Sequence, residues 1–176
     1  ELTLDPNTVN TALSLSEGNR KVECVMETQS YPDHPERFSH WRQVLCSESL
    51  TGRCYWETEW SGWGVYISVA YKSIRREGRS DDCVFGANKK SWSLFCCDNK
   101  YFVLYNKNRT DLPSPPPSSN RVGVYVDYEA GTLSFYSIST DTHTPTHLHT
   151  FTTTFTEPLC AGFRVNYNSS VRLYVI

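Results

Sequence analysis

Three groups of residues in this 176-residue chain carry side chains that could do chemistry, and the first resembles a metal site. Asp141, His143, His147 and His149 follow one another closely, and imidazole with carboxylate suits a divalent transition metal. However, Pro145 interrupts the segment, and the threonines around it are typical of a loop. We interpret these side chains as solvated and predict no metal ion.

The other two groups are a carboxylate pair and a cysteine pair. Glu57 and Glu59 are two residues apart in a predicted strand, so they share one face and resemble the paired acids of a glycosidase, but that face is expected to meet solvent. Cys96 and Cys97 are adjacent, so only one of them can face outward, and no residue near them in sequence is placed to lower its pKa. With no Gly-x-Ser-x-Gly and no glycine-rich phosphate loop, we predict a non-enzymatic protein without a cofactor.

Composition narrows the class of protein further. The chain is 39% hydrophobic and 14% aromatic, which indicates a folded domain, and its net charge of −2 argues against a nucleic-acid partner. No apolar run approaches the ~20 residues that cross a bilayer, so we predict no direct membrane insertion. The chain begins at Glu1 without a methionine, and we expect it to be cut from a longer protein.

The cysteines bear on the compartment. There are seven, an odd number without a C-x-x-C pair, which favours reduced thiols buried in strands and a cytoplasmic protein. Two glycosylation-type triplets, Asn108-Arg109-Thr110 and Asn168-Ser169-Ser170, leave a secreted protein as the alternative.

Strand patterns dominate the chain. Residues 54–60 alternate apolar and polar side chains, residues 65–71 repeat the pattern, and with the turn-forming Ser61-Gly62 between them they predict a central hairpin. Asp5-Pro6-Asn7 predicts an N-terminal turn or short helix, and Ser14–Gly18 a further turn. Further strands are predicted at 21–28, 41–46, 91–97, 101–105, 121–127, 132–137, 148–155, 159–165 and 171–176. The short turns at 98–100 and 128–131 predict two more hairpins, one joining 91–97 to 101–105 and one joining 121–127 to 132–137. Because no segment has a helical period, the sequence predicts an all-β sandwich.

Two segments are predicted to be exposed loops. Residues 30–38 contain two prolines, which cannot join a ladder, and aromatic residues there could anchor the loop or contact a partner. Pro113–Ser119 is proline-rich; it predicts a stiff surface loop, with a polyproline ligand for an SH3-type partner as the alternative.

Several motifs together resemble the PRY-SPRY domain, in the branch found in fish proteins. They are Leu4-Asp5-Pro6, Tyr55-Trp56-Glu57-Thr58-Glu59, the segment from Val126 to Tyr136 that begins Val-Asp-Tyr-Glu-Ala-Gly-Thr, and Pro158-Leu159-Cys160-Ala161-Gly162-Phe163. The resemblance covers essentially the whole chain and implies a PRY segment at residues 1–53 and a SPRY segment at 54–176, together one compact domain.

The resemblance implies a bent β-sandwich of two antiparallel sheets that recognises a protein or peptide through loops at one end and performs no catalysis. Carried over by motif, the partner-binding residues are Tyr31, Arg37, Phe38, Trp41, Tyr66, Lys72, Arg79, Asp82, Phe95, Cys97, Phe163 and Arg164. Relatives that grip an antibody or peptide have tryptophans at the positions of Phe95 and Cys97, and this chain keeps an aromatic residue only at the first.

The fish branch includes tripartite-motif proteins, NOD-like receptors and stonefish-type cytolysins. The resemblance therefore implies either target recognition in a larger immune or ubiquitin-ligase protein, or a C-terminal cytolysin domain for assembly or cell-surface binding. Residues preceding this domain would separate the two.

Overall fold

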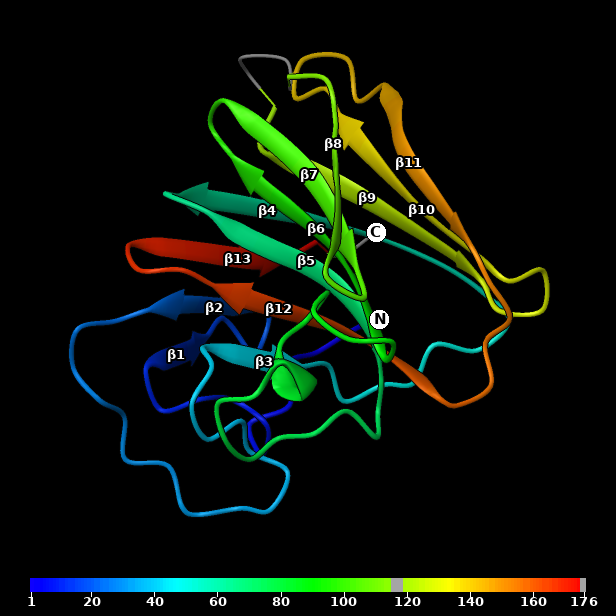
Figure 1. Cartoon of the computed structure of the whole chain (residues 1–176). Coiled ribbons are helices and arrows are strands. Elements are labelled where there is room, and N and C mark those ends of the chain that lie inside the picture. The colour runs from blue at the N-terminus through cyan, green and yellow to red at the C-terminus, as the bar shows by residue number, and fades with distance from the viewer. Residues whose placement is uncertain (115–118, 175–176) are drawn as a thin grey trace.

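Two antiparallel β-sheets packed face to face form the protein in the computed structural model, which describes residues 1–114 and 119–174 (Figure 1). The seven-stranded sheet contains, in spatial order, β1 (Leu13–Ser16), β2 (Lys21–Cys24), β13 (Ser169–Leu173), β4 (Arg53–Gly62), β9 (Arg121–Asp127), β10 (Thr132–Ile138) and β11 (Pro145–Thr152). The six-stranded sheet contains β3 (Gln43–Leu45), β12 (Leu159–Val165), β5 (Val65–Tyr71), β6 (Ser91–Cys97), β7 (Lys100–Tyr105) and β8 (Asn108–Asp111).

The predicted all-β sandwich is confirmed. In the described part of the chain the one helical element is the short 3₁₀ turn η1 (Asp81–Cys83), and the Asp5-Pro6-Asn7 segment lies in a turn. No helix among the described residues is long and apolar enough to cross a membrane.

Two of the predicted hairpins are also confirmed. Strands β6 and β7 pair with Phe95 opposite Phe102, and strands β9 and β10 pair with Val124 opposite Phe135. Each pair is joined by a short turn of polar residues or glycine, and this turn chemistry is visible in sequence.

The predicted central hairpin is wrong. Strand β4 pairs with β13 and β9 in one sheet, whereas β5 pairs with β12 and β6 in the other, so the chain crosses between the sheets at residues 62–64. Gly62 makes this corner with φ +98°, and a Cβ there would lie 2.0 Å from the backbone oxygen of Asn168. Such a corner requires glycine, as many hairpin turns do. The apolar–polar alternation of the two flanking strands is the same in both cases, so the sequence pattern does not distinguish a corner from a hairpin.

Several strand limits differ from the prediction. Residues 13–16 form β1 rather than part of a turn, and the reversal comes later, at Glu17, Gly18 and Asn19, which all have positive φ. Strand β2 ends at Cys24, four residues before the predicted end at residue 28, and the Met26 side chain beyond it is 87% exposed. Strand β8 was not predicted, and β11 begins at Pro145. The proline-rich prediction falls mainly on residues 115–118, outside the described residues, as do the last two residues of the predicted final strand.

The main core lies between the sheets and takes one side of most strands, although all four residues of β8 are exposed. On β5, for example, Val65, Ile67 and Val69 face this core. A smaller cluster covers the opposite face of the six-stranded sheet, where loop residues close over Ala70 and Cys160; its members are Phe38, Leu45, Ala70, Ile74, Phe85 and Cys160. Part of the outer face is therefore covered by loops, and the remainder is open to form a site.

Candidate functional site

A row of side chains crosses the outer face of the six-stranded sheet, one from each of five neighbouring strands. The strand register places Arg164 on β12 opposite Tyr66 on β5, Tyr66 opposite Phe95 on β6, and Phe95 opposite Phe102 on β7. The next strand, β8, places Asp111 opposite Phe102. Directly paired residues on adjacent strands point to the same face of a sheet. Each side chain of the row therefore lies next to the one on the neighbouring strand.

The row is a continuous stack of rings and guanidinium groups. Ring centroids of Tyr66 and Phe95 are 4.8 Å apart, and those of Phe95 and Phe102 are 4.7 Å apart with nearly parallel planes. The Arg164 guanidinium carbon lies 4.8 Å from the Tyr66 ring and 4.9 Å from the Trp41 ring, so it is held between two aromatic side chains. These contacts pre-arrange the Arg164 guanidinium on the surface.

Cations occupy the other end of the row too. The Arg109 guanidinium carbon lies 3.9 Å from the Phe102 ring centroid, and the Lys100 ammonium lies 5.9 Å from it. Arg109 is also bound to a carboxylate, because its Nε lies 2.6 Å from Asp111 Oδ1. We call Trp41, Arg164, Tyr66, Phe95, Phe102 and Arg109 the aromatic-arginine row.

A hollow of about 230 Å³ opens beside the Arg164 end of the row. Its walls include His40, Trp41, Arg42 and Arg164, and no carboxylate lines it. Burial lowers the pKa of the Arg164 guanidinium, and the nearby Arg42 lowers it further. An arginine nevertheless remains charged at neutral pH, so the hollow is positive.

Two turns of the sandwich bound the row near Phe95. A Cβ on Gly64 would lie 2.9 Å from the Phe95 ring, so this glycine lets the β4–β5 corner pack directly against the row. Beyond Gly64, the Trp63 ring is 66% exposed and packs against Tyr167 at a centroid distance of 5.5 Å.

The structure brings together four of the predicted partner-binding residues, namely Trp41, Tyr66, Phe95 and Arg164. Cys97 lies two residues beyond Phe95 on the same face of β6, partly exposed, with its thiol 3.4 Å from Asn99 Oδ1. Their role in binding stays a prediction, but their contact with one another is now an observation.

Two predicted contact residues need correction. Phe38 and Phe163 are both 0% exposed, so neither side chain is available to a partner. Phe163 alternates with Arg164 on β12 and therefore faces the core between the sheets, while Phe38 packs edge-on against Phe85 in the outer cluster. Neighbouring residues of a strand point to opposite faces, so only one of Phe163 and Arg164 can lie on the outer face. The sequence motif does not indicate which of the two it is.

Arg37 is engaged in holding its own loop. Its Nη1 donates to the carbonyl oxygens of Pro6 and Val9, each at 2.8 Å, and its Nη2 donates to that of Pro32 at 2.7 Å. Its guanidinium also lies over the Tyr31 ring, whose hydroxyl donates to the Leu13 carbonyl oxygen. The aromatic residues of this loop were expected either to anchor the loop or to contact a partner. The contacts of Tyr31 support the anchoring role.

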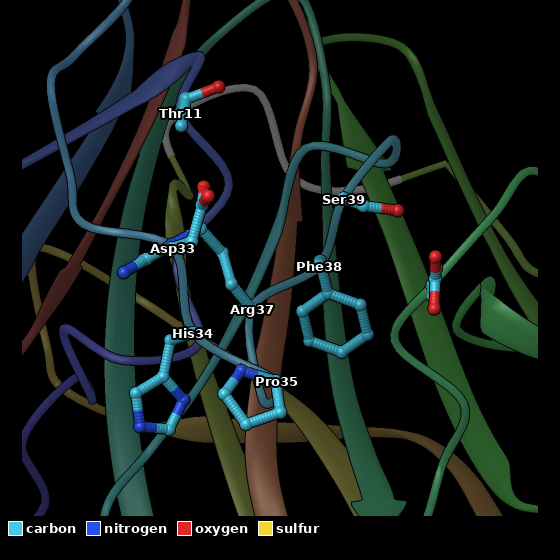
Figure 2. Close-up of a pocket in the computed structure, with 8 residues that line it drawn as sticks. Thr11, Asp33, His34, Pro35, Arg37, Phe38 and Ser39 are labelled. Carbon is cyan, nitrogen blue, oxygen red and sulfur yellow. The ribbon is translucent and has the colours of Figure 1, made fainter.

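The loop that Arg37 holds encloses a second hollow, of about 450 Å³. Figure 2 shows it lined by side chains from the loop, among them Asp33, His34, Pro35 and Arg37. Glu77 from the following long loop also lines it, so this hollow is of mixed charge, unlike the positive hollow beside Arg164.

Three predicted residues lie away from the row. Lys72 follows the last residue of β5, whereas Tyr66 is near its first, and strand rise separates the two by roughly 20 Å. Arg79 and Asp82 belong to the loop beyond Lys72, and Asp82 lines a separate, open hollow with Lys89 and Lys107. The predicted site is thus divided between two regions.

Sequence reasoning missed Phe102, Arg109 and Arg42. The first could have been found, because the predicted 91–97 and 101–105 hairpin already sets Phe95 opposite Phe102. Arg109 lies on the unpredicted strand β8, and Arg42 reaches the hollow only through the three-dimensional path of its loop.

The residues with catalytic or metal-binding chemistry do not assemble a reactive centre. Among the described residues no three His, Cys, Asp or Glu side chains gather as metal ligands, and His147 and His149 lie on β11 beside Tyr136 and Phe151. Glu57 and Glu59 are engaged by neighbours on the seven-stranded sheet: Tyr55 donates to the first at 2.7 Å, and Tyr174 to the second at 2.6 Å.

All seven cysteines, each within the described part of the chain, are free. Cys96 faces the core, where burial raises the pKa of its thiol well above the ordinary value, and Cys97 is partly exposed. The two therefore point to opposite faces, as alternation requires.

Comparison with known proteins agrees with this architecture. The chain matches the SPRY-associated domain model, PRY, over residues 2–50 and the SPRY domain model over residues 53–175. The chain belongs to the PRY-SPRY family. Domains of this family mediate protein–protein interaction, and this PRY-SPRY domain is accordingly a protein-interaction module.

Its relatives include fish toxins and tripartite-motif proteins. Stonustoxin subunit beta of Synanceia horrida is 43% identical over 94% of this chain and 23% of the toxin subunit. Tripartite motif-containing protein 16 of Mus musculus is 38% identical over 93% of this chain and 29% of that protein. The PRY-SPRY domain thus spans about a quarter of the length of these relatives.

Solved structures show the same two groups. The stonustoxin structure superposes with a TM-score of 0.91 at 37% identity, over 99% of this chain and 28% of that chain. The crystal structure of the TRIM65 PSpry domain superposes with a TM-score of 0.88 at 27% identity, over 99% of this chain and 90% of that chain.

Proposed function

We propose that this PRY-SPRY domain is a non-catalytic module that recognises a protein or peptide through the aromatic-arginine row, and that it gives target specificity to a larger immune or ubiquitin-ligase protein. The observation that carries the proposal is the register-matched stack of Arg164, Tyr66, Phe95 and Phe102. Aromatic and arginine side chains are the residues that contribute most to protein interfaces, and here they are fixed in place before a partner arrives.

The surroundings of the row suit an interface. Tyr66 and Phe95 are partly exposed, while Phe102 beneath Arg109 is buried, so the row has a rigid base and an accessible surface. Exposed Trp63 and Tyr167 stand at one border, and a polar rim of loops surrounds the remainder. Much of the affinity would come from burying these rings, because aromatic side chains bring a large apolar area to an interface.

A second proposal is that the domain is the C-terminal part of a pore-forming cytolysin and serves assembly or cell-surface binding. The toxin subunits among its relatives, at identities up to 43%, favour this possibility. In that case the parent protein would be secreted; in the first case it would be cytoplasmic. The residues that precede the domain in its gene decide between them: RING, B-box and coiled coil, or a nucleotide-binding domain with leucine-rich repeats, against a perforin-like domain.

A pull-down from extracts of the source tissue tests recognition by the row. The wild-type domain is compared with the Tyr66→Ala, Phe95→Ala double variant and with Tyr55→Ala, a matched control on the other sheet whose ring is 44% exposed. We expect the double variant to lose partners that both other proteins retain. Recovery of the same partners by all three proteins would show that the row is not the binding surface.

A further inference from the structure

Arg42 and Arg164 differ in their partners from most arginines of the described part of the chain, although the exposed Arg79 also has no ion pair there and Arg75 donates only to the Glu77 carbonyl oxygen. Arg20, Arg53, Arg109, Arg121 and Arg172 each form an ion pair with a carboxylate, and Arg37 and Arg76 each donate to three backbone carbonyl groups. Arg164 contacts the Trp41 and Tyr66 rings, and no carboxylate or carbonyl oxygen among the described residues accepts a hydrogen bond from it. Arg164 and the exposed Arg42 line the same hollow, which therefore has two cations in its wall.

The N–H groups of the Arg164 guanidinium are free to donate hydrogen bonds to a ligand. The faces of Arg164 are covered by Trp41 and Tyr66, at 4.9 and 4.8 Å, so the group is fixed in orientation. A guanidinium donates only in its own plane, and that plane matches the two oxygens of a carboxylate. Arg42 is exposed and Arg164 is half-buried, so an anion that enters the hollow is attracted by both charges.

The other polar groups in the walls of the hollow do not neutralise the two arginines. Asn10 cannot serve as a competing internal partner, because its amide nitrogen donates to the Phe38 carbonyl oxygen and its amide oxygen accepts from the Ala12 N–H. The indole N–H of Trp41 is buried and lacks an acceptor among the described residues. Among those residues, Arg42 and Arg164 line the hollow and no carboxylate does.

We propose that the Arg42–Arg164 hollow binds a carboxylate side chain, Asp or Glu, of the partner, and that an apolar side chain two residues away from it in the same extended segment packs on Tyr66 and Phe95. This inference rests on the proposed function, because it assigns a ligand chemistry to the same row. The spacing follows from the geometry: steps of 4.8 Å separate Arg164 from Tyr66 and Tyr66 from Phe95, and alternate side chains of an extended peptide are roughly 7 Å apart.

A positional-scanning library of acetylated, amidated hexapeptides tests the proposal on the wild-type domain and three variants. Arg42→Ala with Arg164→Met removes both charges while Met keeps apolar packing between the rings. Tyr66→Ala with Phe95→Ala removes the apolar platform, and Arg53→Ala removes an exposed arginine from β4 in the other sheet. Circular dichroism and thermal unfolding confirm that each variant is folded before binding is measured.

The expected result is selection of Asp or Glu at one position and of an apolar residue two positions away. The Arg42, Arg164 variant should bind the selected peptides about 10- to 100-fold more weakly, the magnitude of losing charge-assisted hydrogen bonds, and should lose the acidic preference while keeping the apolar one. Arg53→Ala should bind as wild type does, because Arg53 lies on the other sheet. Binding by the wild type should also weaken as salt is raised.

Other outcomes overturn the inference in distinguishable ways. Peptides selected without acidic residues, or with phosphoserine preferred over Asp and Glu, would refute the carboxylate assignment and leave recognition by the row intact. Failure of the wild type to select any peptide, together with an unchanged pull-down by the Tyr66, Phe95 variant, would refute both the inference and the proposed function.

Discussion

Arg37→Ala separates a structural role from a binding role for a residue that sequence reasoning placed in the binding site. The substitution removes three hydrogen bonds from a charged donor, to the carbonyl oxygens of Pro6, Val9 and Pro32, and the contact with the Tyr31 ring. These bonds join the 30–38 loop to the N-terminal segment, so their loss should be measured in the stability of the fold. A binding role would instead appear only in affinity.

The expected loss is about 3 kcal/mol in the free energy of unfolding. A hydrogen bond from a charged donor contributes ~1.5–3 kcal/mol when buried, but two of these three lie at exposed positions, so we assign about 1 kcal/mol to each. The buried Nε of Arg37 has no acceptor among the described residues, so its removal costs nothing. For a chain of this length, a change of about 3 kcal/mol lowers the melting temperature by roughly 6–12 °C.

Urea unfolding followed by tryptophan fluorescence measures the effect, with Arg79→Ala as the matched control. Arg79 is exposed, and its substitution should change stability by less than about 0.5 kcal/mol. Arg37→Lys should fall between wild type and Arg37→Ala, because an ammonium group cannot reach all three carbonyls in one plane. An Arg37→Ala domain with the wild-type urea midpoint but reduced partner capture would refute the structural assignment.

Three further predictions follow from the packing. Gly62→Ala should destabilise the fold by more than about 3 kcal/mol or prevent soluble expression, because its Cβ would lie 2.0 Å from the Asn168 backbone oxygen at a φ of +98°; a soluble variant with the wild-type melting temperature would contradict this. Iodoacetamide at mildly alkaline pH should alkylate Cys97 in the native domain and Cys96 only after unfolding, as mass spectrometry of peptides would show. Burial raises the pKa of the Cys46 and Cys96 thiols, so their contribution to stability should be full below the unfolded-state value of about 8.5 and decline as pH rises above it; constant stability from pH 7 to 10 in urea titrations would refute this.

The candidate site was only partly visible in sequence. Phe95 and Tyr66 were identified through motifs, and the hairpin register that adds Phe102 could have been deduced, since it depends on one short turn. Arg42 and the Trp41–Arg164 contact could not, because they join a loop near the start of the chain to a strand near its end. Lys72, Arg79 and Asp82 were grouped with the row by motif, yet strand length sets Lys72 at the far end of β5.

The sequence alone determined that this chain is a β-sandwich and which residues of most strands face inward. Alternation in segments such as 121–127 and 132–137 is a local property, and burial of one face is the main force that it reports. The tertiary structure decided which strands become neighbours, as the separation of β4 and β5 into different sheets shows. Strand pairing depends on contacts between residues distant in sequence, and so does the aromatic-arginine row, because it exists only where five strands lie in register.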